Sequence, residues 1–239
     1  MNIRLIPGLV LGLATTLSAS AALITEPTRT FAVTPPAGNI PDVQNPGMVF
    51  QQTVLDSLIL QLTDVVVGLH LVGQSEGTGW ASEIHVLLNR DLGPNSATLL
   101  NRVGFSTADT ELGQGYDGWD VTFDDAAING DVHLAELSQG VLTGTWAPDG
   151  RDQAVDVARP YTLAVFDGLT GNGDWYLSVA DLVSGGSMQL VSWSLTLTGH
   201  DSIEETPAPS PVPETSTWLA GAGLAAAGLA RRWRVRNRQ

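Results

Sequence analysis

Residues 171–181 read GNGDWYLSVAD, and this stretch decides the fold class. Its first four letters, GNGD, form a cluster of turn residues. The following residues alternate, with Trp175, Leu177 and Val179 on one side and more polar residues between them. Because successive side chains of a strand point to opposite faces, this pattern predicts a half-buried β-strand that begins at a turn.

The same period of two recurs on both sides of this stretch. Residues 84–88 and 193–198 alternate in the same way, and turn signals fall at 77–79, 93–95, 129–131, 148–150 and 185–186. The apolar run from Leu58 to Val72 is longer, and we split it near Thr63-Asp64 into two predicted strands. Only Asp131 to Ser138 suggests a short helix. Many short strands with regular turns predict an all-β, jelly-roll-like β-sandwich of about eight strands.

Composition excludes several classes of function. The chain has 239 residues, a net charge of −14 and no Cys. A protein that binds nucleic acid needs a basic face, so the acidic balance argues against that partner. Without Cys there are no disulfides, thiolate zinc sites, iron–sulfur clusters or Cys nucleophiles.

The N-terminus has the pattern of a secretory signal peptide. A start with one charged residue, Arg4, precedes an uncharged, mostly apolar stretch from Leu5 to Leu17, and small residues follow at Ala19 and Ala21. This order is typical of a signal helix with an A-x-A cleavage site. We therefore expect residues 1–21 to be removed by signal peptidase after Ala21 or Ala22.

The C-terminus has the pattern of a short membrane helix. The uncharged stretch from Thr215 to Ala230 would reach about 24 Å as a helix, against about 30 Å for the hydrocarbon core. Five Arg follow between 231 and 238. By the positive-inside rule this cluster stays cytoplasmic and the body lies outside.

Val212, Pro213, Glu214 and Thr215 stand just before this apolar run. A Pro-Glu motif, a short apolar helix and an Arg-rich end together resemble the PEP-CTERM sorting signal of Gram-negative bacteria. Thr215 stands where that signal usually has Pro. The resemblance implies processing by an exosortase-type membrane protease, transfer to the cell exterior, and a link to exopolysaccharide and biofilm.

Proline-rich segments separate the body from both ends. We expect a signal peptide at 1–21, a Pro-rich segment at 22–39, the sandwich at 40–200, a Pro-rich linker at 201–211 and the sorting signal at 212–239. Residues 22–217 hold all 25 acidic residues and five Arg, so the body carries 5 − 25 = −20. A body of this charge is well solvated and repels anionic lipid and nucleic acid.

Several body segments follow the order of a known module: VTFDDA at 121–126, LTGTWAPDG at 142–150, LAVFDG at 163–168, GNGDWYLSVAD at 171–181 and LVSWSLTLT at 190–198. This order resembles the P domain, also called the P/Homo B domain, of proprotein convertases. The resemblance implies a jelly-roll sandwich, which in convertases packs beside a subtilisin-like domain and stabilises it. No nucleophile segment of such an enzyme stands in this chain.

We find no catalytic constellation, neither a G-x-S-x-G elbow nor H-E-x-x-H nor a P-loop. The four His are scattered, and we expect each on the solvated surface.

The acidic turns have two interpretations. They could bind calcium through carboxylate and loop oxygens, with Asp124, Asp125 and Asp181 as the candidate ligands, or the Asp side chains could cap turns without any metal.

Five Trp lie in the body. We expect Trp146, Trp175 and Trp193 in the core. Trp80 and Trp119 lie among Gly, Ser and Asp, so we expect them in loops. There they would form either a stacking platform for sugar rings or caps on one end of the sandwich.

These features together predict an exported, non-enzymatic protein of the cell surface or extracellular matrix. It would be anchored transiently in the inner membrane by its C-terminal helix, and it would bind exopolysaccharide or another protein. Two alternatives stay open: an accessory module of a separately encoded, secreted subtilisin-like protease, and a carbohydrate-binding lectin.

Overall fold

The alternating residues after the 171–174 turn form strand β8 (Gly173–Asp181), as predicted. A computed structural model describes residues 26–35, 38–43, 47–73, 83–105, 117–136, 140–186 and 188–201. The chain divides into two units, residues 1–203 and 204–239, and every described residue belongs to the first unit.

Strand β8 lies inside a four-stranded antiparallel sheet. The order is β2-β8-β4-β5, with bounds Met48–Val54 for β2, Ile84–Arg90 for β4 and Ser96–Asn101 for β5. Strand β8 pairs with β2 on one side and β4 on the other, so its backbone is hydrogen-bonded along both edges.

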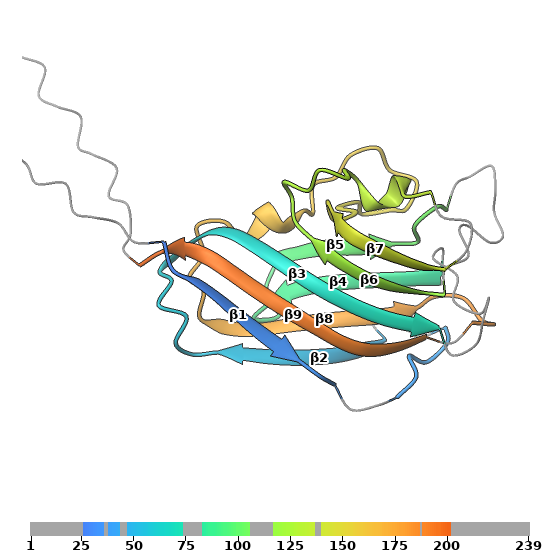
Figure 1. Cartoon of the computed structure of the whole chain (residues 1–239), viewed down its shortest axis with the longest axis horizontal. Coiled ribbons are helices and arrows are strands. Elements are labelled where there is room, and N and C mark those ends of the chain that lie inside the picture. Colours follow the sequence, from blue (N-terminus) through green and yellow to red (C-terminus); the bar gives the residue numbers. More distant parts are fainter. Residues whose placement is uncertain are drawn as a thin grey trace, which may run out of the picture. The chain divides into compact units, whose positions relative to one another are not determined.

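A second sheet has five strands in the order β1-β9-β3-β6-β7. Its bounds are Thr28–Val33 for β1, Met188–His200 for β9, Gln61–Gly73 for β3, Gly118–Phe123 for β6 and Val141–Trp146 for β7. Within this sheet β6 and β7 run parallel and the other neighbouring strands run antiparallel. Figure 1 shows the two sheets as stacked layers, with the five-stranded sheet toward the viewer. The two-sheet, all-β prediction is confirmed, and the described residues form nine strands where about eight were expected.

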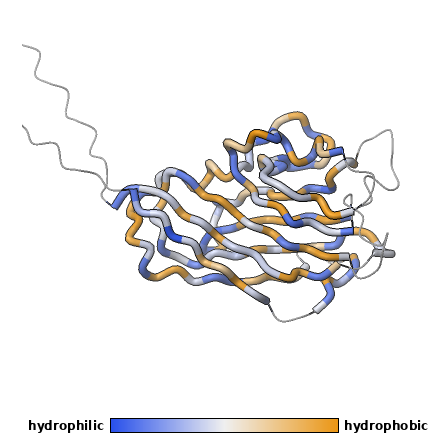
Figure 2. Tube along the Cα trace, in the orientation of Figure 1, coloured by the Kyte–Doolittle hydropathy of each residue, from blue (hydrophilic) through white to orange (hydrophobic). Residues whose placement is uncertain are grey.

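The core lies between the inner faces of the two sheets. Hydrophobic and hydrophilic residues alternate along the strands (Figure 2), so one face of each sheet is apolar. Trp175 and Trp193 are 0% and 2% exposed, as predicted, and the Trp175 ring meets Phe166 edge-on at 5.0 Å between centroids. Trp146 is half-buried and packs against the edge of this core.

The predicted split of the 58–72 run into two strands is wrong. Strand β3 continues from Gln61 to Gly73 and pairs with β9 along that length. The register shifts between Leu62 and Asp64, so Thr63 is the extra residue of a β-bulge. A bulge accommodates a polar residue within an apolar run without ending the strand.

The sandwich also begins earlier than predicted. Residues 28–33, which we assigned to a Pro-rich segment ending at 39, form β1 and pair with β9. The reason is that these residues alternate. Phe31 and Val33 pack against the core, whereas Thr30 and Ala32 are exposed.

The helical content is small. The predicted short helix at 131–138 is one turn of 3-10 helix, η2 (Val132–Leu134), and a second such turn is η3 (Leu163–Phe166). Among the described residues, no helix is long or apolar enough to cross a membrane. The predicted signal peptide with Ala19 and Ala21, and the predicted sorting signal with Val212 to Thr215, lie outside the described residues.

Candidate functional site: a polar pocket beside a buried charge cluster

Four charged side chains and one histidine gather between η2 and the loop after β7. The Nδ1 atom of His133 lies 2.6 Å from Oδ2 of Asp149. Arg151 reaches Asp131 at 2.6 Å and Asp149 at 3.1 Å, and the Nε atom of Arg159 lies 3.6 Å from Asp131. The side chain of Asp149 is fully buried, and those of Asp131, His133 and Arg151 are at most 10% exposed. The predicted surface location is therefore wrong for His133, which is part of a buried charge cluster (Asp131, His133, Asp149, Arg151 and Arg159).

The strand order brings this cluster together. Because β6 and β7 are parallel, the chain must cross over between them, and η2 lies on that connection. The bridge between Asp131 and Ala147 joins this connection to the end of β7. Asp131 also caps η2 by accepting a hydrogen bond from the backbone N–H of His133 at 2.9 Å.

Burial lowers the pKa of Arg151, but hydrogen bonds to Asp131 and Asp149 and their negative charges outweigh this effect and raise it overall. The guanidinium therefore stays charged. Buried charges are tolerated when they are paired and hydrogen-bonded, so the cluster is satisfied internally and positions the chain around it.

The cluster fastens the loop after β7 to the free edge of β5. The backbone N–H of Asp149 donates to Leu99 and that of Gly150 donates to Thr98, at 3.0 and 2.8 Å. The side-chain amide of Asn101 donates to the carbonyls of Arg151 and Asp152, at 3.3 and 3.1 Å. The loop that follows, residues 151–157, is thereby held against the outer side of the four-stranded sheet.

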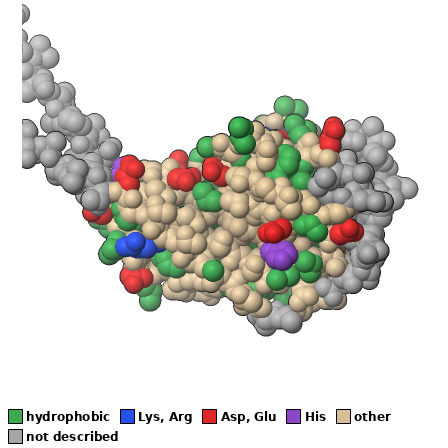
Figure 3. Space-filling model, in the orientation of Figure 1, with side chains coloured by type: hydrophobic (Ala, Val, Ile, Leu, Met, Phe, Trp, Pro, Cys, Tyr) green, Lys and Arg blue, Asp and Glu red, His purple; other side chains and the backbone are tan. Residues whose placement is uncertain are grey.

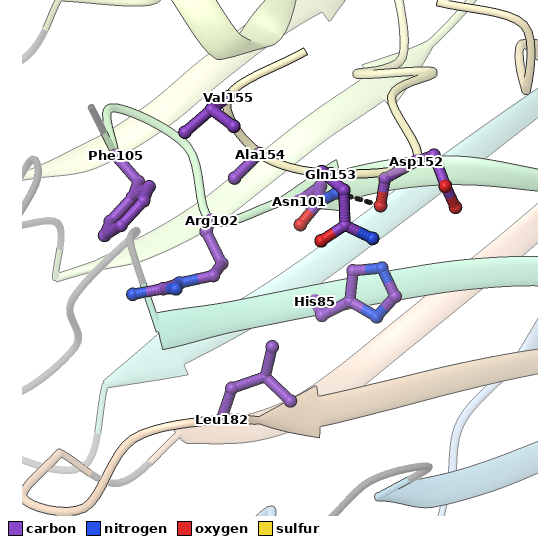
Figure 4. A pocket seen from close by; sticks show the side chains of 9 residues that line it. All are labelled: His85, Asn101, Arg102, Phe105, Asp152, Gln153, Ala154, Val155 and Leu182. Atoms are coloured by element: carbon purple, nitrogen blue, oxygen red, sulfur yellow. Dashed lines mark hydrogen bonds between the residues drawn. The ribbon is translucent and has the colours of Figure 1, made fainter. Parts of the chain in front are cut away.

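A pocket of about 300 Å³ lies between this loop and strands β4 and β5. Figure 4 shows His85 on β4 with the Gln153 side chain pointing from the loop toward it. Because Ile84 and Val86 point into the core, alternation directs His85 to the outer face, where it is half-buried. Burial lowers the pKa of His85, and the nearby Asp149 charge opposes this more weakly. The imidazole is therefore neutral at pH 7.

The other end of the pocket carries an Arg–aromatic pair. The guanidinium carbon of Arg102 lies 3.8 Å from the centre of the Phe105 ring, which is a cation–π contact. Asn101, Asp152 and Leu182 are among the remaining lining residues. The lining thus mixes amide, carboxylate, imidazole and guanidinium groups with an apolar wall.

Two buried carboxyl groups adjoin Leu182, which lines this pocket: Asp181 precedes it, and the carbonyl of Glu83 accepts from its N–H. Glu83 and Asp181 are 4% and 1% exposed, next to the β4–β8 pair in which Ile84 opposes Asp181. Burial raises the pKa of Glu83 to about 7, and the negative charges of Asp181 and Asp42 add to this effect. The positive charge of Arg102 lowers the pKa, but more weakly. Burial and the Asp42 charge raise the pKa of Asp181 to about 6, although its hydrogen bond from Val183 lowers it. The Oδ2 atom of Asp181 has no hydrogen-bond partner among the described residues.

The predicted calcium ligands do not come together. Asp124 accepts a hydrogen bond from the Ala126 N–H at 2.8 Å, and Asp125 accepts from the N–H groups of Leu163 and Ala164 at 3.1 and 2.7 Å. Asp181 belongs to the other sheet. The described residues hold no group of three His, Cys, Asp or Glu that could bind a metal ion. Asp124 thus caps its own turn and Asp125 caps the start of η3, and the calcium site stays a prediction.

The predicted loop position of Trp119 is wrong. Trp119 lies in β6, opposite Leu71, and is 0% exposed, so its ring has no free face for a sugar. The alternation of Trp119 and Val121 with Asp120 indicated a strand, but the surrounding Gly and Asp residues obscured it. Trp80 lies outside the described residues.

A second hollow of about 280 Å³ lies across the five-stranded sheet, where Ala32, Ser194, Gly68 and Thr122 occupy one cross-strand row. Small side chains in a row lower the surface there. Figure 3 shows one face of the molecule, on which Asp and Glu side chains outnumber Arg. The residues that line this hollow lie on strands β1, β9, β3 and β6 or directly after β1.

Comparisons with known proteins add a distant likeness. No family model and no curated protein matches the chain. One similar solved structure is the Aeromonas sobria serine protease in complex with its chaperone, at 17% identity over 76% of this chain and 28% of that chain, with a TM-score of 0.41. The Aeromonas sobria serine protease alone gives 15% identity, 75% and 28% coverage and a TM-score of 0.40. The chain thus spans less than a third of those proteins' length, and a likeness at this level carries no conclusion about function.

Proposed function

We propose that this chain is an exported, non-enzymatic protein of the cell surface or extracellular matrix, and that its P-domain-like, jelly-roll sandwich is a binding module. Export is supported by the signal-peptide pattern of residues 1–21 and by the sorting-signal pattern of residues 212–239. A Sec-type signal peptidase and an exosortase-type protease would be its processing partners. The body's charge of −20 suits an exposed, well-hydrated protein.

The observation that supports binding over catalysis is the separation of the buried charge cluster from the open pocket. The His133–Asp149 contact could orient an imidazole for proton transfer, but both side chains are at least 91% buried and are fixed by their neighbours. Among the described residues, the pocket over His85 is lined by two amides, a carboxylate, an imidazole and a guanidinium beside apolar side chains. These polar groups suit hydrogen bonds to a bound ligand.

Mass spectrometry of the protein from its own cells tests this function, because it determines both mature termini. The expected N-terminus is Ala22 or Leu23, on a protein that external protease removes from intact cells. Recovery of Met1 on a protein that is protected inside the cell would contradict export. Hydrolysis of a polysaccharide or peptide by the purified chain would contradict the non-enzymatic assignment.

A further inference from the structure

We propose that the pocket over His85 binds one neutral sugar unit, such as the terminal residue of a polysaccharide. This inference rests on the proposed binding function and names its ligand class. The pocket's volume of about 300 Å³ is at the small end for ligand sites. It suits a single hexose ring better than an oligosaccharide.

The charge of the lining favours a neutral ligand. Arg102 and Asp152 carry opposite charges, and the third titratable lining residue, His85, is neutral at pH 7 because burial lowers its pKa. An anion would meet Asp152 within a strongly acidic body, and a cation would meet Arg102. A ligand without charge avoids both costs.

The polar lining groups match hydroxyls. Amides and a carboxylate have planar, divergent donor or acceptor sites, and a neutral imidazole has one of each. Gln153 and Asp152 on the loop and His85 on β4 supply such groups. A sugar hydroxyl both donates and accepts, so it can bond to each of these three side chains, whereas an apolar ligand would remove them from water without replacing those bonds.

The apolar lining groups match the carbon faces of a sugar ring. Leu182 and Val155 line the pocket together with the Phe105 ring, one side of which contacts Arg102. Burying C–H groups against such a wall adds a hydrophobic contribution to binding. A sugar ring presents both hydroxyls and C–H faces, so it matches both parts of this lining.

The site is also preorganised. The Nε atom of Arg151 donates to the carbonyl of Asp156 at 2.8 Å, and Asn101 holds the carbonyls of Arg151 and Asp152. The buried charge cluster thus fixes the loop that forms one wall before any ligand arrives, which reduces the entropy lost on binding.

Titration of the full-length protein tests the proposal with glucose, galactose and mannose, and with glucuronate and glucosamine as charged counterparts. At least one neutral hexose should bind saturably with a Kd on the order of 1 mM, and both charged sugars should bind more weakly. Gln153→Leu should weaken binding about tenfold because it removes one hydrogen-bonding group. Gln51→Leu, an exposed amide on β2 outside the pocket, is the matched control and should keep the Kd.

Three results would overturn the proposal: no saturable binding of a neutral hexose, tighter binding of a charged sugar, or an unchanged Kd in Gln153→Leu. Circular dichroism of each variant separates loss of binding from loss of fold. The test of export is independent, since a correctly exported protein that binds no sugar retains the proposed location and loses only this ligand. A cytoplasmic protein that binds hexose would contradict the proposed location, but it would support the sugar site.

Discussion

His133, which precedes strand β7 in the chain, and Asp149, which follows it, form a buried contact of 2.6 Å. Strand β7 starts beside Gly118 and leads to Ala147, which bridges Asp131, so the strand returns the chain to η2. Arg151 then bonds to Asp149 and to Asp131. The cluster therefore locks the crossover before β7 to the loop after it.

Arg151→Met should destabilise the protein by about 3–5 kcal/mol, because it leaves the carboxylates of Asp131 and Asp149 buried with fewer partners. Urea denaturation followed by Trp fluorescence measures the change in the free energy of unfolding. The control is Arg29→Met, because the exposed Arg29 side chain on β1 donates to the neighbouring carbonyl of Thr28. It should cost less than about 0.5 kcal/mol. Equal effects of the two substitutions would show that the cluster adds nothing.

Glu83→Gln should stabilise the protein above pH 7. The pKa of Glu83 rises from 4.5 to about 7 in the folded chain, so the folded state holds an extra proton between these values. The free energy of unfolding therefore falls as pH rises through that window, and Asp181 acts in the same direction between 3.8 and about 6. Gln resembles the protonated acid at all pH values, so the gain should be about 1–3 kcal/mol at pH 8 and close to zero at pH 4.

Thermal unfolding from pH 4 to pH 8 checks this prediction. Asp42 and Arg102 are the other charged groups that influence Glu83, and both stay in place in the variant. Exposed Glu136→Gln is the control and should change the stability by less than about 0.5 kcal/mol. A Glu83→Gln protein that is less stable than the parent at pH 8 would disprove the assignment.

The sequence predicts strands where the period of two is strict. It does not predict which side chains from different strands and loops come into contact. Alternation predicts that Trp175 and Trp193 lie in the core, and both are buried there. At Trp119 the neighbouring Gly and Asp residues predict a loop, whereas the alternation with Val121 agrees with the strand that forms. The contact of His133 with Asp149 depends on the parallel pairing of β6 and β7. The local alternation of residues does not show which strands become neighbours in a sheet. Only the grouping of Asp149 and Arg151 around Gly150 in the 148–152 turn hinted at the cluster.

Leu58→Asn should stabilise the protein by about 0.5–1 kcal/mol. Leu58 has a φ of 62°, in the left-handed region that costs most L-residues about 1–2 kcal/mol and that Asn adopts more easily. Its side chain is 61% exposed, so little apolar burial is lost. Leu55, which is 78% exposed and is not among the residues with positive φ, provides the control. Leu55→Asn should show no gain in melting temperature. If it gained as much as Leu58→Asn, the cause would be the more polar surface and not the backbone conformation of residue 58.

Trp119→Ala should destabilise the protein by about 3–5 kcal/mol, because a fully buried indole leaves a large cavity. Exposed Val49→Ala on β2 should cost less than about 1 kcal/mol. Sugar titration of the same variants separates two roles for this Trp. If its ring stacked on a sugar, Trp119→Ala would keep its stability and lose hexose binding. The buried position predicts the opposite result: Trp119→Ala loses stability, and it loses hexose binding only where the protein is unfolded. Titration at a temperature where the variant remains folded should therefore give the parent Kd.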